Sequence, residues 1–382
     1  MRPLPTLRVP WRALAIGAVI AAIIGGGSLA LSAAKQAAPP DYLFNDSHFH
    51  LTNYVQKGTD IHKYVEQIMG DKVGRSTLFG IPLQQMWSYG NSGDFAPTYY
   101  LQSDAPLYYY SFTDAYIARV YQSLPKAQQA RLDPMITGFN PADMYGVDHI
   151  RRVLELFPGI FSGIGEFTIH KEFVSAKIAG ETASLTNPAL DRILDFAGEV
   201  GLAVILHNDI DMPFAKAGTE PVYLTQMRNL LRRHPNTTII WAHFGLGRIV
   251  HPVQGQATED TAERSSAYQE IVEQTVNDPT LSHVYYDISW DEVAKYAIAT
   301  PESVRRTVTA FNSHPEKFLF GTDNVAPADQ ETQLRVYHLW DPVWTQLTPE
   351  ASLKIRKGNY ERIFDAARAK VRAWEKANVK PL

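Results

Sequence analysis

The motif Asp46-Ser47-His48-Phe49-His50 places two histidines one residue apart. Residues 42–48 have the apolar character of a strand, and side chains at positions i and i+2 of a strand point to the same side. His48 and His50 therefore leave the end of this predicted strand together and can share one metal ion. Neutral imidazole suits zinc, iron or manganese. A single H-x-H pair is common by chance, so the prediction depends on further ligands.

Four more ionisable residues come directly after strand-like apolar runs elsewhere in the chain. If the runs are parallel strands of one barrel, their carboxyl ends converge on one face, which is where active sites of such barrels lie. Any single residue of this kind is usually only the start of a loop. Several in separate units predict a shared site instead, and these residues are Glu166, His207, His243 and Asp323.

The elements that must position these residues follow an alternating pattern. Short apolar runs alternate with amphipathic stretches from residue 42 onward, which is typical of βα units and a parallel sheet. We expect strands at 42–48, 76–81, 134–137, 159–166, 202–207, 238–243, 284–289 and 318–322. We expect helices at 55–69, 116–131, 142–156, 189–199, 223–233, 263–276, 301–312 and 332–347. Eight pairs predict an α/β fold, a (β/α)8 TIM barrel, as a single domain over residues 41–382.

The segment 84–113 is the main interruption of this pattern. It is rich in Tyr, Gly and Pro and has no clear period. We therefore expect a long loop there. Loops of this length in compact domains tend to be functional. Its aromatic side chains are expected mostly to pack, and some of them could roof a pocket.

These residues and motifs resemble the amidohydrolase superfamily, in particular its amidohydrolase-related (type 2) branch. The resemblance covers residues 46–364. It is carried by the H-x-H motif, by Trp241-Ala242-His243-Phe244-Gly245 and by Phe320-Gly321-Thr322-Asp323. The segment 357–364 is similar to the closing G-N-x-x-R-[LI]-F motif of that branch. The match is specific to fold and superfamily and says little about substrate.

The resemblance implies metal ligands. His48, His50 and Asp323 would hold a buried divalent ion, and His207 would bind it or a neighbouring ion. His243 would bind a second ion, or polarise the substrate in an enzyme with one ion. Many members with two ions bridge them by a carboxylated lysine on the fourth strand. Here that place is taken by Glu166, as in the TatD-like branch, where Glu is a ligand.

One tightly held ion, zinc before other metals, is the favoured interpretation, and a second ion is kept as an alternative. Such an ion lowers the pKa of water and polarises a carbonyl or phosphoryl oxygen. Asp323 would take the proton from the attacking water and return it to the leaving group. His243 would stabilise negative charge that develops on the substrate oxygen.

Residues for substrate binding are sought in the loops beside these ligands. Arg248 could bind a carboxylate or phosphate with two hydrogen bonds, although an arginine at such a place is more often a bracing residue. His170, Trp290 and Asp291 complete the set of pocket candidates.

Several functions fit the same ligands. The leading prediction is hydrolysis of a C–O or C–N bond in a small molecule, an ester, lactone or amide. Non-oxidative decarboxylation of an aromatic or related acid is a lyase reaction found in the same branch. Phosphoester hydrolysis and a non-catalytic binding role are kept as further alternatives.

The first forty residues predict export. Arg2, Arg8 and Arg12 precede an uncharged apolar segment, 13–34, which is the pattern of a signal peptide and is also long enough to span a membrane. The segment 1–40 is therefore a signal peptide or membrane anchor with a linker, and arginines on its amino-terminal side keep that end in the cytoplasm. The catalytic body is expected in the periplasm or on the outer side of the membrane.

Composition excludes several classes of function. The chain has no cysteine, so disulfides, thiol nucleophiles and thiolate metal sites are ruled out. The formal net charge of −4 and the absence of a basic run give no support to nucleic-acid binding. The expected partner is a small-molecule substrate, and the sequence does not indicate an oligomeric state.

Overall fold

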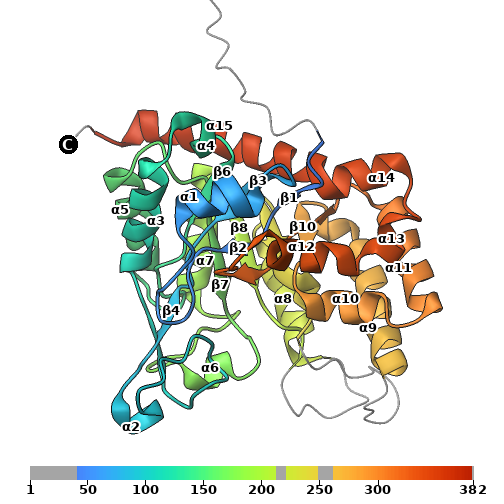
Figure 1. Cartoon of the computed structure of the whole chain (residues 1–382), viewed down its shortest axis with the longest axis horizontal. Helices are drawn as coiled ribbons and strands as arrows, with labels where there is room; N and C mark the ends of the chain where they lie inside the picture. Colours follow the sequence, from blue (N-terminus) through green and yellow to red (C-terminus); the bar gives the residue numbers. More distant parts are fainter. Residues whose placement is uncertain (1–40, 212–220, 248–260, 381–382) are drawn as a thin grey trace, which may run out of the picture. The chain divides into compact units, whose positions relative to one another are not determined.

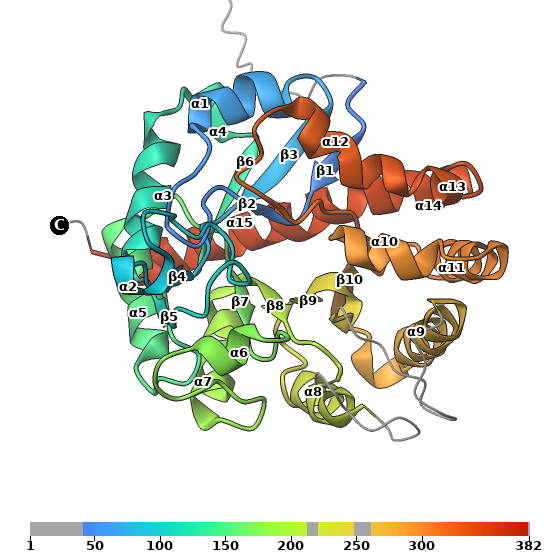
Figure 2. The same ribbon diagram turned by 60° about the horizontal axis from the view of Figure 1, so that its bottom comes forward.

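The computed structural model describes residues 41–211, 221–247 and 261–380, and these residues belong to one compact unit. Its centre is an eight-stranded sheet in which every neighbouring pair is parallel. The order follows the chain: β1 (Phe44–Asp46), β3 (Val73–Leu78), β6 (Leu132–Ile136), β7 (Gly163–Thr168), β8 (Ala203–His207), β9 (Ile239–Trp241), β10 (Val284–Asp287) and β11 (Phe318–Leu319). The sheet curls with helices around its outside, as an α/β barrel requires (Figure 2).

Hydrogen bonds join the two edges of this sheet. The Ser47 amide donates to the Phe320 carbonyl at 3.0 Å, and the Asp323 amide donates to the His48 carbonyl at 2.8 Å. Beyond them, β2 (Phe49–His50) pairs in parallel with β12 (Asn324–Val325). The first and last strands of the barrel therefore meet at the residues predicted to bind metal.

The helices agree with the predicted pattern in order, and two of the predicted helices are split. The expected helix 116–131 is α3 (Phe112–Ser123) and α4 (Lys126–Gln129), because Leu124 precedes Pro125 and is extended. The expected helix 332–347 is α12 (Gln330–Leu339) and α13 (Asp341–Trp344). The remaining barrel helices are α1 (Ile61–Lys63) with a π-helical turn (Tyr64–Met69), α5 (Gly146–Leu156), α7 (Pro188–Val200), α8 (Val222–Arg233), α9 (Thr261–Val276), α10 (Asp291–Ala297) and α11 (Pro301–Ser313).

The strand boundaries also differ from the prediction. The expected strand 42–48 is interrupted after Asp46, because the Asp46 carboxylate accepts the His48 amide at 3.1 Å and bends the chain there. The second strand begins at Val73, three residues earlier than expected. The expected loop 84–113 contains an antiparallel pair, β4 (Leu83–Gln85) with β5 (Leu107–Tyr109), and a short helix, α2 (Tyr89–Ser92).

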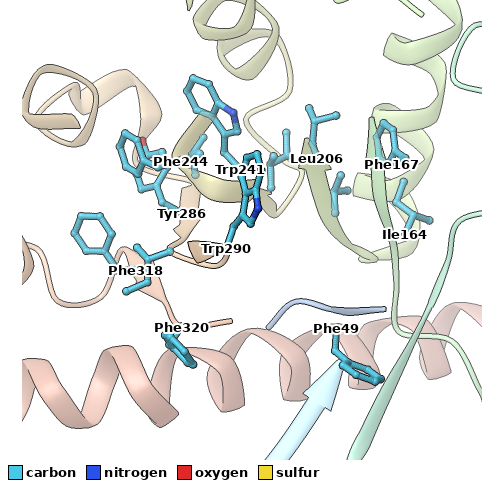
Figure 3. Packing of buried hydrophobic residues seen from close by; sticks show 14 of the residues in the cluster. Phe49, Ile164, Phe167, Leu206, Trp241, Phe244, Tyr286, Trp290, Phe318 and Phe320 are labelled. Atoms are coloured by element: carbon cyan, nitrogen blue, oxygen red, sulfur yellow. The ribbon is translucent and has the colours of Figure 1, made fainter. Parts of the chain in front are cut away.

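Two hydrophobic layers hold the barrel. The larger cluster lies between the sheet and the helices, and Figure 3 shows part of it, with Trp241 and Tyr286 from the neighbouring strands β9 and β10 and Phe244 from the turn after β9. The smaller cluster combines strand residues such as Met135, Ile205 and Leu319 with one side of a long helix at the end of the chain. The strands thus bury both faces, which explains their almost uninterrupted apolar runs.

The helix at the end of the chain, α15 (Asn359–Asn378), was not among the predicted elements and is preceded by α14 (Pro349–Leu353) and a π-helical turn (Lys354–Gly358). Its residues Tyr360, Ile363 and Phe364 pack in the smaller cluster. Asn359 donates to the carbonyls of Pro315 and Phe318 at 2.7 and 2.8 Å. The closing motif of the family resemblance therefore has a structural task, because it attaches this helix to the last strand. Figure 1 shows α15 at the opposite end of the body from α2 and α6 (Val174–Lys177).

None of the helices in the described ranges is long and apolar enough to cross a membrane. The predicted signal or anchor, 13–34, lies outside those ranges.

Candidate metal centre

The carboxyl ends of the strands bring all six predicted ligands together. His48 follows β1, His50 ends β2, Glu166 lies in β7, His207 ends β8, His243 follows β9 and Asp323 follows β11. All six are nearly or wholly buried. Their donor atoms form two overlapping groups that could each hold an ion, and Glu166 belongs to both; a third group in the described residues combines His48 and His243 with Asp287.

The first group surrounds Oε2 of Glu166. This oxygen lies 3.4 Å from Nε2 of His48 and 3.1 Å from Nε2 of His50. Oδ1 of Asp323 lies at the same two distances from those nitrogens. Ligand atoms that share one ion at bond lengths of about 2.0–2.2 Å must be roughly 3 Å apart. The spacing in this group therefore fits one shared cation.

The second group surrounds the other oxygen, Oε1 of Glu166. It lies 2.6 Å from Nδ1 of His207 and 3.4 Å from Nε2 of His243. The two oxygens of one carboxylate thus face different pairs of histidines, which is the arrangement of a bridging ligand.

A buried carboxylate, Asp287 at the end of β10, orients two of the imidazoles. Its Oδ2 lies 2.8 Å from Nδ1 of His48. Its Oδ1 accepts from the Ser289 hydroxyl at 2.5 Å, and that hydroxyl lies 2.8 Å from Nδ1 of His243. Because a carboxylate only accepts, His48 donates to it directly and His243 donates to the Ser289 oxygen. In both neutral imidazoles Nε2 then carries the lone pair and faces the ligand groups.

Asp209 contacts the His207 ring in a similar way and orients it. Its Oδ1 lies 2.8 Å from Nε2 of His207, and Oε1 of Glu166 lies 2.6 Å from Nδ1, so each ring nitrogen faces a carboxylate oxygen. Without a metal the protonated ring can donate to both carboxylates, and with a metal ion beside Nδ1 the remaining proton stays on Nε2. Asp46 supports the site differently, because it accepts from the backbone and hydroxyl of Thr322 and from Gln333, and so braces the loop before Asp323.

The residues fit a divalent metal. Nε2 of His48 and Nε2 of His243 are buried and have no hydrogen-bond partner in the described part of the chain. Imidazole nitrogens and carboxylate oxygens are the donors that zinc and related ions take in catalytic sites. Polar atoms without partners are costly to bury, so this donor set indicates a site built for a cation.

The buried histidines and carboxylates of this centre shift each other's pKa values. Burial alone would raise the pKa of Asp323, but His243, His50 and His48 outweigh it and hold that pKa well below its usual range. Burial would likewise lower the pKa of His48, and the Asp287 and Glu166 carboxylates raise it well above its usual value. Without a metal the Asp287 and Glu166 carboxylates therefore favour the protonated form of His48, and a metal ion must displace that proton to bind Nε2.

Backbone strain is concentrated at these strand ends. His243, Trp290 and Asp323 have φ values of 53°, 76° and 56°, in the left-handed region that side chains other than glycine rarely adopt. Such residues persist where the surrounding structure holds them, and they cluster at functional sites.

The pocket candidates are placed differently from one another. Trp290 lies beside the ligands, with its ring 5.2 Å from the His243 ring. His170 stacks on Tyr223 at 3.7 Å, and Asp291 is an exposed residue at the start of α10. Arg248 lies outside the described ranges. The substrate contacts of all four stay predictions.

Sequence reasoning missed Asp287, Ser289 and the importance of Lys171. Asp287 lies inside the expected strand 284–289, and the predicted ligands were the ionisable residues that follow each apolar run. Lys171 was not among the predicted site residues. The signal that could have found Asp287 is an acidic side chain inside an otherwise apolar, buried strand.

A family model described as amidohydrolase matches residues 46–366. This chain belongs to the amidohydrolase superfamily. With its buried groups of histidine and carboxylate ligands, this amidohydrolase is an enzyme, a metal-dependent hydrolase. No curated protein matches the chain closely enough to count as a relative.

Solved structures with a similar fold are distant in sequence. An amidohydrolase from Burkholderia multivorans with bound zinc is 13% identical, with 85% of this chain and 99% of that chain covered and a TM-score of 0.48. Dihydroorotase from Campylobacter jejuni is 13% identical, with 85% and 84% covered and a TM-score of 0.48. Amidohydrolase 2 from Bifidobacterium longum subsp. infantis is 13% identical, with 84% and 98% covered and a TM-score of 0.42.

Proposed function

We propose that this amidohydrolase hydrolyses a C–O or C–N bond of a small molecule, an ester, lactone or amide, with metal-activated water. The observation that carries the proposal is the position of Glu166, whose two oxygens each face a separate pair of imidazoles. A divalent metal bound by these residues supplies Lewis acidity, which lowers the pKa of water and polarises the substrate carbonyl.

We further propose two ions, with zinc as the metal and Glu166 as the bridge. His48, His50 and Asp323 would hold the first ion, and His207 and His243 the second. The support is that both donor groups are buried, that Asp287 directs the Nε2 lone pairs of His48 and His243 into them, and that Asp209 holds the opposite side of the His207 ring. This replaces the interpretation of a single ion favoured by sequence.

Asp323 is the proposed general base and acid. Its Oδ1 faces the first group, while Oδ2 lies 3.9 Å from Nε2 of His243 and faces the second. A carboxylate at this position can take a proton from water on one side and return it to the leaving group. Its lowered pKa keeps it ionised at neutral pH, as the first step requires.

His243 is better suited to bind metal than to donate a hydrogen bond to substrate. Burial lowers its pKa, so the ring is neutral at pH 7. Its one proton is held on Nδ1 by Ser289, and Nε2 therefore has no hydrogen to offer.

The test is elemental analysis of the purified protein together with a panel of esters, lactones, amides and aromatic carboxylic acids. We expect two divalent ions per chain and turnover that is lost with a chelator and restored by zinc. Release of carbon dioxide from an aromatic acid would show that the enzyme is a decarboxylase and would contradict the proposed hydrolysis. Turnover that survives complete removal of metal would contradict the proposal, and one ion per chain would refute the second site alone.

A further inference from the structure

We propose that Lys171 binds a carboxylate of the substrate, so that the natural substrate is a carboxylate-bearing ester, lactone or amide. The proposal rests on the hydrolytic function above and adds a substrate class to it. Lys171 follows β7, the strand that carries Glu166, and its residue is only 9% exposed.

The turn after β7 holds Lys171 in place through its backbone. The Lys171 amide donates to the Ser175 hydroxyl at 3.3 Å, and the Lys171 carbonyl accepts the Val174 amide at 2.8 Å. Its ammonium lies 5.6 Å from the centre of the Trp290 ring, which in turn lies 5.2 Å from the His243 ring. The ammonium is therefore at the edge of the metal centre, on the side of Trp290.

This ammonium makes no hydrogen bond within the described ranges, and no carboxylate oxygen there lies within 4.0 Å of it; its contact is the face of the Trp290 ring. Its nitrogen is not one of the wholly buried polar atoms that lack a partner, so it keeps some contact with solvent although the residue is only 9% exposed. A largely buried charge gains from a hydrogen-bonded partner. Lys177 at the end of α6 shows the contrast, because its ammonium donates to the carbonyls of Tyr100 and Ser103 at 2.5 and 2.6 Å. The partner of Lys171 is therefore expected to come from outside the chain.

The carboxylates whose charges act most strongly on Lys171 are those of the proposed ligands Glu166 and Asp323. Burial would lower the pKa of Lys171, and Glu166 and Asp323 raise it through their charges. When a metal ion neutralises those two carboxylates, Lys171 loses that support. An anion brought by the substrate would replace it.

The remaining surroundings favour such an anion. Tyr54 and Tyr100 lie near enough to affect the pKa of Lys171, and their rings are 5.5 Å apart. Both are buried, as is Trp290. Aromatic neighbours exclude water, and an ammonium–carboxylate contact is stronger where water is excluded. One ammonium balances one negative charge, which a carboxylate supplies.

The first experiment measures binding without turnover. Zinc-loaded protein is titrated with benzoate and with neutral benzamide by calorimetry, for the wild type, Lys171→Met and Lys171→Arg. A hydrogen-bonded charge pair predicts that Lys171→Met weakens benzoate binding about 10- to 100-fold and leaves benzamide unchanged. Lys171→Arg should recover part of the loss. Equal benzoate binding by the wild type and Lys171→Met, or no benzoate binding by the wild type, would overturn the proposal.

The second experiment compares a substrate that carries a carboxylate with its methyl ester at that carboxylate. Loss of the wild-type preference in Lys171→Met, through KM rather than kcat, supports the proposal. Equal losses on both substrates indicate a different role and overturn it. Lys177→Met is the matched control, because it removes a lysine whose donors are already satisfied, and it should leave the preference unchanged. If the wild type hydrolyses neither substrate, the proposed hydrolytic function is contradicted. The benzoate titration then still decides whether Lys171 binds a carboxylate.

Discussion

Nδ1 of His48 lies 2.8 Å from Oδ2 of Asp287, and this contact joins the first strand of the barrel to the seventh. The other oxygen of Asp287 reaches His243 through the Ser289 hydroxyl. One buried carboxylate therefore sets the direction in which two imidazoles present their lone pairs. Carboxylates that orient metal-binding histidines in this way raise both affinity and activity.

We expect Asp287→Asn to weaken zinc binding about 10- to 100-fold, because an amide can offer a hydrogen to His48 and turn the ring's lone pair away from the metal. A competition titration with a coloured chelator measures the change. Ser289→Ala is the matched variant, since it breaks only the path to His243 and should give a smaller loss. Zinc affinity equal to that of the wild type in Asp287→Asn would show that the carboxylate does not position His48.

His48→Ala and Asp323→Asn are each expected to abolish turnover, with circular dichroism unchanged from the wild type. The first removes a ligand, and the second removes both a ligand charge and the proposed base. His338→Ala is the control, because this histidine is exposed on α12. Full activity in either of the first two variants would refute the assignment of the site.

Asp133 supplies a prediction for stability at the other end of the barrel. It is wholly buried, contacts Arg75 and Arg368, and accepts from the Tyr360 hydroxyl of α15 at 2.7 Å. Asp133→Asn removes the buried partner of both arginines and should lower the free energy of unfolding by about 3 kcal/mol at pH 7. Asp365→Asn removes an exposed partner of the same Arg75 and should cost less than about 1 kcal/mol. Denaturant unfolding measures both.

The effect of Asp133 also depends on pH. Burial would raise the pKa of Asp133, but Arg75 and Arg368 outweigh it and lower that pKa below its value in the unfolded chain. Its contribution to stability is therefore present above the unfolded pKa and is lost as the pH falls through the folded one. The difference in the free energy of unfolding between the wild type and Asp133→Asn should become smaller as the pH is lowered. A difference that stays constant from pH 7 to pH 3 would contradict this account.

Export of the protein is a separate proposal, supported by the sequence pattern of residues 1–40. Cell fractionation should find the enzyme in the periplasm or with the membrane. Mass spectrometry of the recovered chain then separates a cleaved signal, with the amino terminus near residue 34, from a retained anchor. An intact chain in the cytoplasmic fraction would refute the proposal.

The proposed ligands could be found from sequence because active-site residues of a barrel lie near the ends of its strands, and five of the six end or follow a strand while Glu166 lies within β7. Asp287 was missed because the strand was expected to continue to residue 289, whereas β10 ends at Asp287. Helix α15 was not predicted, because it packs against one end of the barrel and this packing is not shown by any local sequence pattern. Lys171 needed the structure as well, since an unsatisfied ammonium can be recognised only when its neighbours are known.

The pairing of β2 with β12 has a consequence for how the enzyme matures. His50 and Asp323 lie 273 positions apart, and they meet only when the last strand closes on the first. A chain still emerging from the ribosome would hold its early histidines without their distant carboxylate partner. Metal binding at the proposed centre is therefore expected to come late in biosynthesis, after almost the whole polypeptide has been made.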